Sequence, residues 1–298
     1  MSLGFAAAAW VPPKPPIVMV AADSRISFDQ AQSPIDTGIK VYDLGGRAAM
    51  VAAGFALPAL TAAEIVRPIV ANHNRQTPDR RMGFYDTTRL LSFFLKRTAE
   101  RQNGLCEVAI SGFLSSGAPA VAYVIVSPDR NRVIFHSIKS NDTMAISVGG
   151  HPEASRLLMQ GFAAAKRQGK PVIATGLCLL WYIAQHPAFS SVGGGIAVGT
   201  CMSSDDSFSW PIVEFSGQRF LRGFDVTASY RPSWPLPEVA PYDEEWCHEL
   251  DQRIAKGQGL TIATSIAVSG YEIDSLSTPD DLFKTRDDPE AFENGVAV

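Results

Sequence analysis

Residues 17–27 read IVMVAADSRIS and contain the feature around which the chain is organised. The apolar first half is typical of a buried β-strand, and this strand ends at three polar residues, Asp23, Ser24 and Arg25. The segment therefore places charged side chains where a buried strand leaves the core. Such charges indicate a functional site or, in the simplest alternative, an ion pair between Asp23 and Arg25.

Residues 38–55 read GIKVYDLGGRAAMVAAGF and predict a β-hairpin followed by a helix. Lys40 begins the first strand, and Gly45 and Gly46 form the turn. The chain then returns as a second strand, and Gly54 precedes an alanine-rich helix. The simplest interpretation of Lys40 alone is a solvated residue at the start of a strand, and that of Gly54 is a turn that begins a helix.

The segment Ser2–Trp10 predicts a strand that is buried on both faces, because its alanines permit close approach of other layers. The prolines between Pro12 and Pro16 lack an amide hydrogen, so they cannot continue a ladder and must form the end of a hairpin. The first two strands are therefore expected to pair. If the hairpin is symmetric about Lys14, Phe5 lies opposite Asp23.

Apolar residues at helical spacing predict further helices, and the segments between them predict strands. Helices are expected after residue 54, at 86–102, at 151–169 and at 172–186, with Pro68 kinking or shortening the first and Asp86 capping the second. The last helix is apolar on nearly all sides, so neighbouring elements or another subunit should cover it. Strands are expected within 107–140, 144–150, 191–204 and 208–217. Because β-α-β alternation is absent, this order favours an α+β fold of stacked antiparallel sheets flanked by helices.

Composition excludes several classes of protein. The chain has 298 residues, of which 46% are hydrophobic and 19% are charged, and its formal net charge is −4. This length predicts one large or two small domains. The negative charge argues against a nucleic-acid partner, and the apolar runs are shorter than the roughly 20 residues of a membrane-spanning helix. The N-terminus lacks the basic region of a signal peptide, so we expect a cytoplasmic protein.

Cysteine spacing predicts neither a metal site nor a disulfide framework, and no cofactor is expected. The four cysteines are far apart, and three lie in apolar surroundings, where a small core side chain is the expected role. They are Cys106, Cys178, Cys201 and Cys247. The glycine run Gly193–Gly195 does not match a phosphate-binding loop, so we interpret it as a place of close backbone packing.

Residues 224–298 differ in composition from the preceding part. They contain the proline-rich stretch SYRPSWPLPEVAP, a candidate helix at Asp243–Lys256 and an acidic tail from Asp280. We expect a domain at residues 1–223 and an extension at 224–298 that wraps around it or around a neighbour and is disordered near its end.

Taken together, Asp23, Arg25, Lys40 and Gly54 resemble the proteasome β-subunit family, which includes related bacterial ring proteases. In that family a D-x-R motif closes the second strand, a lysine before V-Y or V-F opens the next, and a glycine precedes the first helix. The resemblance extends from residue 2 to about 223. It implies a four-layer αββα sandwich of two antiparallel sheets between helices.

The resemblance also implies a chemistry, that of an N-terminal nucleophile hydrolase acting on peptide or amide bonds. After removal of Met1, Ser2 is the nucleophile and its α-amine is the base. Lys40 tunes that amine, Asp23 is the counter-ion of Lys40, Arg25 is an outer brace, and the Gly54 amide is an oxyanion-hole donor. The family resemblance further implies self-association into a ring or short helical stack. The sequence leaves open whether an ATPase is a partner.

Two positions depart from the family pattern. Val148 stands where the family has a supporting serine, unless Ser147 substitutes for it. Phe189 and Val192 stand where the family has an aspartate and a serine near the nucleophile's amine. The alternative function is therefore a catalytically silent subunit with the same scaffold, which serves assembly or binding.

Overall fold

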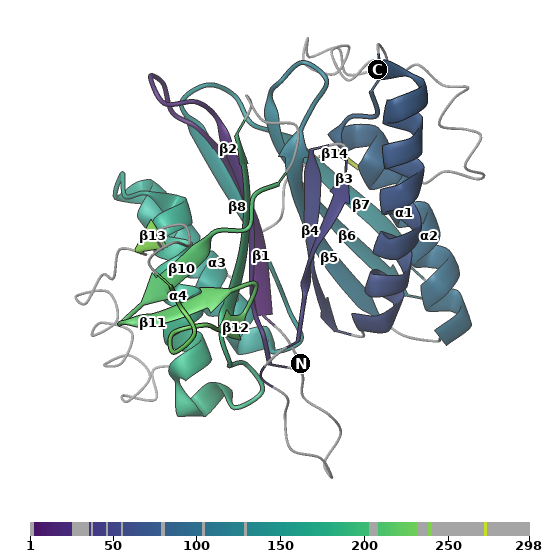
Figure 1. Cartoon of the computed structure of the whole chain (residues 1–298). Coiled ribbons are helices and arrows are strands. Elements are labelled where there is room, and N and C mark those ends of the chain that lie inside the picture. The colour runs from purple at the N-terminus through teal and green to yellow at the C-terminus, as the bar shows by residue number, and fades with distance from the viewer. Residues whose placement is uncertain are drawn as a thin grey trace.

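The computed structural model describes residues 3–25, 36, 38–45, 47–54, 56–78, 81–102, 105–127, 130–202, 208–231, 238–239 and 271–272. Within these residues the chain is an α+β protein whose helices pack on β-sheets, and the strands pair antiparallel with one exception. Figure 1 shows helices α1 and α2 on one outer side of the sheets and α3 and α4 on the other. The α+β class predicted from the order of elements is confirmed.

The N-terminal strand lies inside a four-stranded sheet of order β8-β1-β2-β9. The strands are β1 (Leu3–Trp10), β2 (Ile17–Asp23), β8 (Asp142–Gly149) and β9 (Ile196–Met202). Neighbours in this sheet are antiparallel. The predicted hairpin between the first two strands is confirmed, with the proline-rich segment as its turn.

The register of this hairpin differs from the prediction. Gly4 pairs with Ala22, so the next residue of β2, Asp23, lies opposite Leu3 and not Phe5. Side-chain alternation does not fix the register here, because the alanines of β1 are small and buried on both faces. The observed register brings Asp23 beside Leu3, at the start of β1.

The larger sheet has six strands in the order β14-β7-β6-β5-β4-β3, all antiparallel. They are β3 (Val41–Gly45), β4 (Ala48–Gly54), β5 (Cys106–Phe113), β6 (Pro119–Ser127), β7 (Arg130–Ser137) and β14 (Tyr271–Glu272). The predicted hairpin of residues 40–54 is therefore confirmed as β3 and β4.

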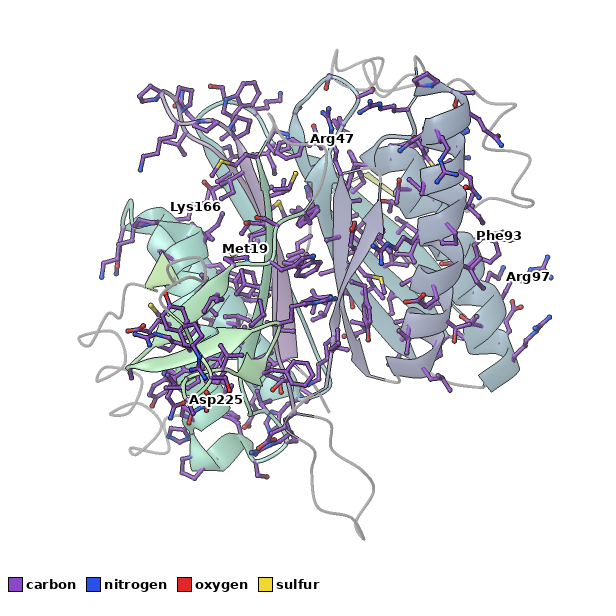
Figure 2. The ribbon with its side chains drawn as sticks, viewed as in Figure 1. Met19, Arg47, Phe93, Arg97, Lys166 and Asp225 are labelled. Carbon is purple, nitrogen blue, oxygen red and sulfur yellow. The ribbon has the colours of Figure 1, made fainter. Side chains whose placement is uncertain are left out.

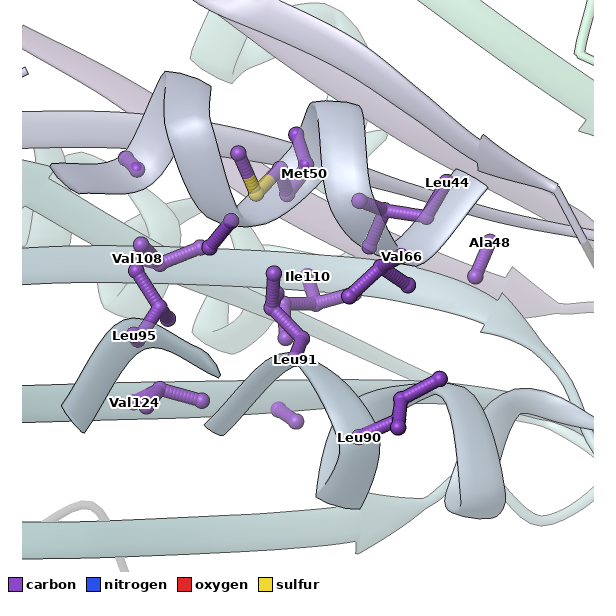
Figure 3. Close-up of a cluster of buried hydrophobic side chains, with 14 of the residues drawn as sticks. Leu44, Ala48, Met50, Val66, Leu90, Leu91, Leu95, Val108, Ile110 and Val124 are labelled. Atoms are coloured by element: carbon purple, nitrogen blue, oxygen red, sulfur yellow. The ribbon is translucent and has the colours of Figure 1, made fainter. Parts of the chain in front are cut away.

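Helices α1 (Ala56–Gln76) and α2 (Phe84–Gln102) cover one face of the six-stranded sheet. Figure 3 shows their contact with the sheet, in which Val66 of α1 and Leu91 of α2 meet Met50 and Ile110 of the strands. These side chains are fully buried. Removing their apolar surface from water stabilises the packing of the two helices on the sheet.

The ends of these helices differ from the sequence prediction in two details. Helix α1 continues through Pro68 to Gln76, so the proline does not end it. Helix α2 begins at Phe84, two residues before Asp86. Asp86 is therefore not the N-cap, but it lies in the first turn, where a negative charge interacts favourably with the helix dipole.

Helices α3 (Pro152–Arg167) and α4 (Val172–Gln185) pack on the four-stranded sheet. The ring of Phe162 in α3 meets that of Phe5 in β1, with centroids 5.3 Å apart. The sequence left open whether α4 is covered by its own chain. It is covered, because Trp181 stacks on Phe215 at 5.2 Å and lies 5.4 Å from Phe220.

Phe215 and Phe220 belong to a small third sheet of order β12-β11-β10-β13. Its strands are β10 (Ile212–Phe215), β11 (Gln218–Leu221), β12 (Phe224–Asp225) and β13 (Glu238–Val239). The pair β10 and β13 is the one parallel pair among the described strands. Three short pieces of residues 224–298 thus lie in sheets, β12 and β13 here and β14 in the six-stranded sheet. The candidate helix Asp243–Lys256 and the acidic tail lie outside the described residues.

The two large sheets face one another across a third group of buried side chains. At one end of this interface, a Cβ atom added to Gly4 would lie 2.4 Å from Cγ2 of Val51 and 2.7 Å from the Ala21 carbonyl oxygen. Only a residue without a side chain permits this approach, so the start of β1 lies directly against β4 (Figure 1). The candidate site lies at this end.

Polar side chains on the outer surface form ordinary solvent-exposed contacts. Lys166 Nζ lies 2.6 Å from Oδ1 of Asp142, and the Arg97 guanidinium lies 5.3 Å from the centre of the Phe93 ring (Figure 2). Within the part of the chain that the structure describes, no helix combines the length and the apolar character needed to span a membrane.

Candidate active site

A buried ion pair joins the two large sheets at the end where β1 begins. Asp23 is the last residue of β2, and Lys40 directly precedes β3. The Nζ atom of Lys40 lies 2.7 Å from Oδ1 of Asp23, and the two side chains are 4% and 0% exposed. The Lys40 carbonyl oxygen accepts a hydrogen bond from the amide of Ala52 in β4, at 3.2 Å. Lys40 is therefore not the solvated strand residue of the simplest sequence interpretation.

From the described residues the Asp23 carboxylate accepts four hydrogen bonds, two on each oxygen. Oδ1 accepts from the Leu3 amide at 2.8 Å and from Lys40. Oδ2 accepts from the Gly193 amide at 3.0 Å and, more weakly, from the Arg25 amide at 3.3 Å. A carboxylate offers about four lone-pair sites, so these donors within the described residues match its capacity. Asp23 thus binds the N-terminal strand, Lys40 and the segment of Gly193 to one another.

The Lys40 ammonium, unlike the Asp23 carboxylate, uses only part of its hydrogen-bonding capacity within the described residues. Two of its three N–H groups are used, one by Asp23 and one by the Arg25 carbonyl oxygen. Burial lowers the pKa of Lys40 below its ordinary value, although the neighbouring Asp23 carboxylate opposes that shift. Within the described part of the chain, the third N–H of Lys40 has no acceptor.

Arg25 forms the outer part of the cluster. Its guanidinium binds the Asp36 carboxylate through two hydrogen bonds, of 2.6 and 2.9 Å, and it donates to the Ser190 carbonyl oxygen at 2.9 Å. The hydrogen bonds that Arg25 donates to the Asp36 carboxylate raise the pKa of Arg25 and lower the pKa of Asp36. Arg25 therefore connects the end of β2 to the segments of Asp36 and Ser190.

The glycine run Gly193–Gly195 packs directly against residues 23–25. The Gly193 carbonyl oxygen accepts hydrogen bonds from the amides of Ser24 and Arg25, at 3.2 and 2.9 Å. The Gly195 amide donates to Ser24 Oγ at 2.8 Å, and that hydroxyl donates to the Asp36 carbonyl oxygen at 2.5 Å. A Cβ atom on Gly193 would lie 2.6 Å from the Arg25 guanidinium carbon. The predicted role of this run in close backbone packing is confirmed.

The other two predicted site residues are Gly54 and Ser2. Gly54 is the last residue of β4 and pairs with Cys106. It lies two residues beyond Ala52, whose amide binds the Lys40 carbonyl, so Gly54 is at the same end of the sheet as Lys40. Ser2 lies outside the described residues. Its covalent neighbour Leu3, however, is bound to Asp23.

The residues that differ from the family pattern are either buried apolar residues or, like Ser147, bonded to another side chain. Ser147 lies across from Phe5 on β8, and its Oγ lies 3.0 Å from the hydroxyl of Ser155 in α3. Val148 is buried between the two large sheets. Ser147 therefore points away from the face that Val148 occupies, toward Ser155 of α3.

Phe189 and Val192 are both buried in the apolar core beneath α3 and α4. The Phe189 ring lies 5.2 Å from the ring of His151 in an edge-to-face arrangement. Neither residue supplies a carboxylate or a hydroxyl to the site.

Sequence reasoning missed Asp36 and the amide of Gly193. Asp36 follows a long polar segment without periodicity, so no local signal connected it with Arg25. The glycine run was a usable signal for Gly193, because three consecutive glycines before a strand indicate close backbone contact. It did not indicate that Asp23 was the partner.

Metal chemistry has no support in the described residues, because they contain no group of three or more histidine, cysteine, aspartate or glutamate side chains placed to hold an ion. Cys106, Cys178 and Cys201 are buried core residues, which is the role expected for cysteines in apolar surroundings, and Cys247 lies outside the described residues. No protein-family model matches the chain. No curated protein matches it either.

Proposed function

We propose that the chain is an N-terminal nucleophile hydrolase of the proteasome β-subunit type that cleaves peptide or amide bonds. One observation carries the proposal. Asp23 Oδ1 accepts hydrogen bonds from both the Leu3 amide and the Lys40 ammonium, so these two nitrogen atoms are within two hydrogen-bond lengths of one another. Standard bond lengths keep the Cα atom of residue 2 about 2.4 Å from the Leu3 nitrogen. Ser2 is therefore tied by covalent geometry to the neighbourhood of Lys40.

The arrangement of cores supports the proposed four-layer αββα sandwich. One group of buried residues lies between the helices α1 and α2 and the six-stranded sheet, a second lies between α3, α4 and the four-stranded sheet, and a third separates the sheets. Three cores in this relation are what four stacked layers require. We propose in addition a cytoplasmic homo-oligomer, in which a ring or helical stack encloses the sites.

The proposed reaction begins once removal of Met1 has freed the α-amine of Ser2. Ser2 Oγ attacks the carbonyl carbon of the substrate, and its proton moves to the α-amine. That proton then goes to the leaving amine as the C–N bond breaks, which leaves an ester on Ser2. Water hydrolyses the ester and restores the hydroxyl. The Gly54 amide is the proposed donor to the oxyanion.

Lys40 has two tasks in this scheme. Its remaining N–H is available to Ser2 Oγ, and its positive charge disfavours protonation of the nearby α-amine. An α-amine has an ordinary pKa near 8, so a neighbouring cation keeps more of it in the neutral, basic form at pH 7. Because burial lowers the pKa of Lys40, the ammonium is lost, and turnover falls, at a lower pH than for an exposed lysine.

The test combines mass spectrometry with turnover of a fluorogenic peptide amide. We expect an intact mass without Met1, measurable hydrolysis, and its loss in Ser2→Ala. Ser147→Ala is the matched control, because this hydroxyl contacts Ser155 on the other side of the strand. A protein that retains Met1, or one whose Ser2→Ala variant keeps full turnover, contradicts the proposal and favours the silent scaffold.

A further inference from the structure

The end of the four-stranded sheet opposite the candidate site is formed by the β1–β2 hairpin and its neighbours. β1 runs away from the candidate site and ends at Trp10. Trp10 pairs with Asp142 of β8, and Ile17 of β2 pairs with Met202 of β9. These strand ends therefore form a row, and the hairpin turn of residues 11–16 continues beyond it (Figure 1).

Apolar surface is exposed on this hairpin and beside it. Val11 is 50% exposed, and Met202 is 44% exposed. Pro12, Pro13 and Pro15 are also exposed. Because proline restricts the backbone, the turn loses little conformational freedom when a partner covers it. Apolar side chains that are gathered on a stiff projection, unlike single scattered ones, indicate a contact with another protein.

Cations lie next to this apolar surface. Lys14 is in the turn, Lys139 precedes β8, and Lys166 and Arg167 end α3, and all four are exposed. Asp142 joins these segments. Its amide donates to the Lys139 carbonyl oxygen at 3.1 Å, and its carboxylate lies 2.6 Å from Nζ of Lys166 (Figure 2).

We call this surface the hairpin face and define it by residues 10–17, 138–143, 163–170 and 200–202. Asp142 is the one acidic residue in these described segments. The hairpin face is therefore locally positive, although the net charge of the chain is −4.

Three of the cations are not neutralised by a neighbour. Lys166 is paired with Asp142. Within the part of the chain that the structure describes, Lys14, Lys139 and Arg167 have no acidic partner. Unpaired surface cations attract an acidic partner and increase the rate at which it associates.

Two other kinds of partner fit this surface less well. A nucleic acid offers phosphates to the cations but has no use for the exposed Val11 and Met202, and the chain as a whole is negative. A second copy in a two-fold contact would place the same positive face against itself, and like charges across an interface are unfavourable.

We propose that the hairpin face is the docking surface for an acidic segment of another protein. Carboxylates of that segment contact Lys14, Lys139 and Arg167, and its apolar side chains cover Val11 and Met202. The proposal is independent of the proposed function, because it needs neither a free N-terminal amine nor hydrolysis.

The test measures binding of a fluorescein-labelled, glutamate-rich peptide that contains two leucines, by fluorescence anisotropy with the full chain. Binding should weaken by about 10-fold or more between about 0.1 and 1 M salt, because the Debye length falls from about 10 to 3 Å. The same peptide with glutamine in place of glutamate should not bind.

Variants locate the binding on the molecule. Lys14→Glu and Arg167→Glu should each weaken binding of the glutamate-rich peptide by about 10-fold, because each places a like charge against it. Val11→Ser should weaken binding at every salt concentration, because it removes apolar contact. Lys96→Glu, at an exposed position on α2, makes the same change in net charge and should bind as the wild type does.

Three results overturn the proposal. The first is no binding at about 1 mM peptide, or equal weakening by Lys96→Glu and Lys14→Glu. The second is a DNA duplex that displaces the peptide and binds Val11→Ser as tightly as the wild type, which assigns the face to nucleic acid. The third is a dimer in sedimentation that Val11→Ser dissociates, which assigns the face to a second copy of the chain.

Discussion

The ion pair between Asp23 and Lys40 should dominate the stability of the site end of the molecule, and removing its two members should have unequal effects. In Lys40→Met, Asp23 loses one hydrogen bond but keeps the amides of Leu3 and Gly193. Breaking a buried ion pair by removing one member costs about 3–5 kcal/mol. Because Asp23 keeps several donors, we expect the lower value, about 3 kcal/mol.

Asp23→Ala should be more damaging. It leaves the Lys40 ammonium buried without its counter-ion, and it leaves the amides of Leu3 and Gly193 without their acceptor. Each buried unsatisfied group adds about 1–3 kcal/mol. We therefore expect a loss of about 5 kcal/mol or more, which approaches the whole stability of an ordinary domain.

The double variant Asp23→Ala/Lys40→Met measures the interaction energy between the two side chains apart from their other contacts. Once Lys40 is replaced by methionine, no buried cation remains, so adding Asp23→Ala should cost much less than it does alone. We expect a coupling energy of about 2 kcal/mol or more. The assay is urea unfolding followed by tryptophan fluorescence, since the chain has five tryptophans and Trp181 is buried. Single variants that each lose less than about 1 kcal/mol, with additive effects in the double variant, refute this account of the site.

Three further predictions follow from the geometry around the site. Gly4→Ala should destabilise the protein by about 1–3 kcal/mol in the same unfolding assay, because the new methyl group meets Val51 and a backbone oxygen; unchanged stability contradicts the close approach of the sheets. Asp36→Asn should lose about 0.5 kcal/mol at pH 7, because the pair with Arg25 is partly exposed. Since the pKa of Asp36 is lowered in the folded state, this difference should shrink progressively as the pH falls below about 4; a difference that stays constant between pH 5 and pH 2 contradicts the ion pair. Burial raises the pKa of Cys106 to about 12, so its thiol should resist alkylation at pH 8 until the protein is unfolded; peptide mapping that finds Cys106 modified in native protein contradicts this.

The order of the elements could be predicted because each one carries its own periodic pattern. In residues 17–54 an apolar run, the Gly45–Gly46 turn and Gly54 predicted three strands and the following helix, and the apolar stripe of α2 was readable at helical spacing. The register of the first hairpin was not readable, because the alanines of β1 do not distinguish its two faces. The two-residue strands β12, β13 and β14 were also missed, since segments this short carry no period.

The candidate site was partly predictable for a related reason. Asp23 and Lys40 stand out because a charged residue at the end of an apolar run needs a partner, and the structure brings the two together. The partner of Arg25 and the amide donors to Asp23 come from remote segments. Asp36 and Gly193 are 11 and 170 residues away from their partners Arg25 and Asp23, so only the folded chain reveals them.

The central claim is that Ser2 bears the nucleophile, and one measurement addresses it directly. The purified protein is treated with an acylating β-lactone, and its N-terminal peptide is analysed by tandem mass spectrometry. The account predicts a peptide that begins at Ser2 and carries the acyl group on the Ser2 hydroxyl. A peptide that begins at Met1, or an acyl group found only on other residues, contradicts it.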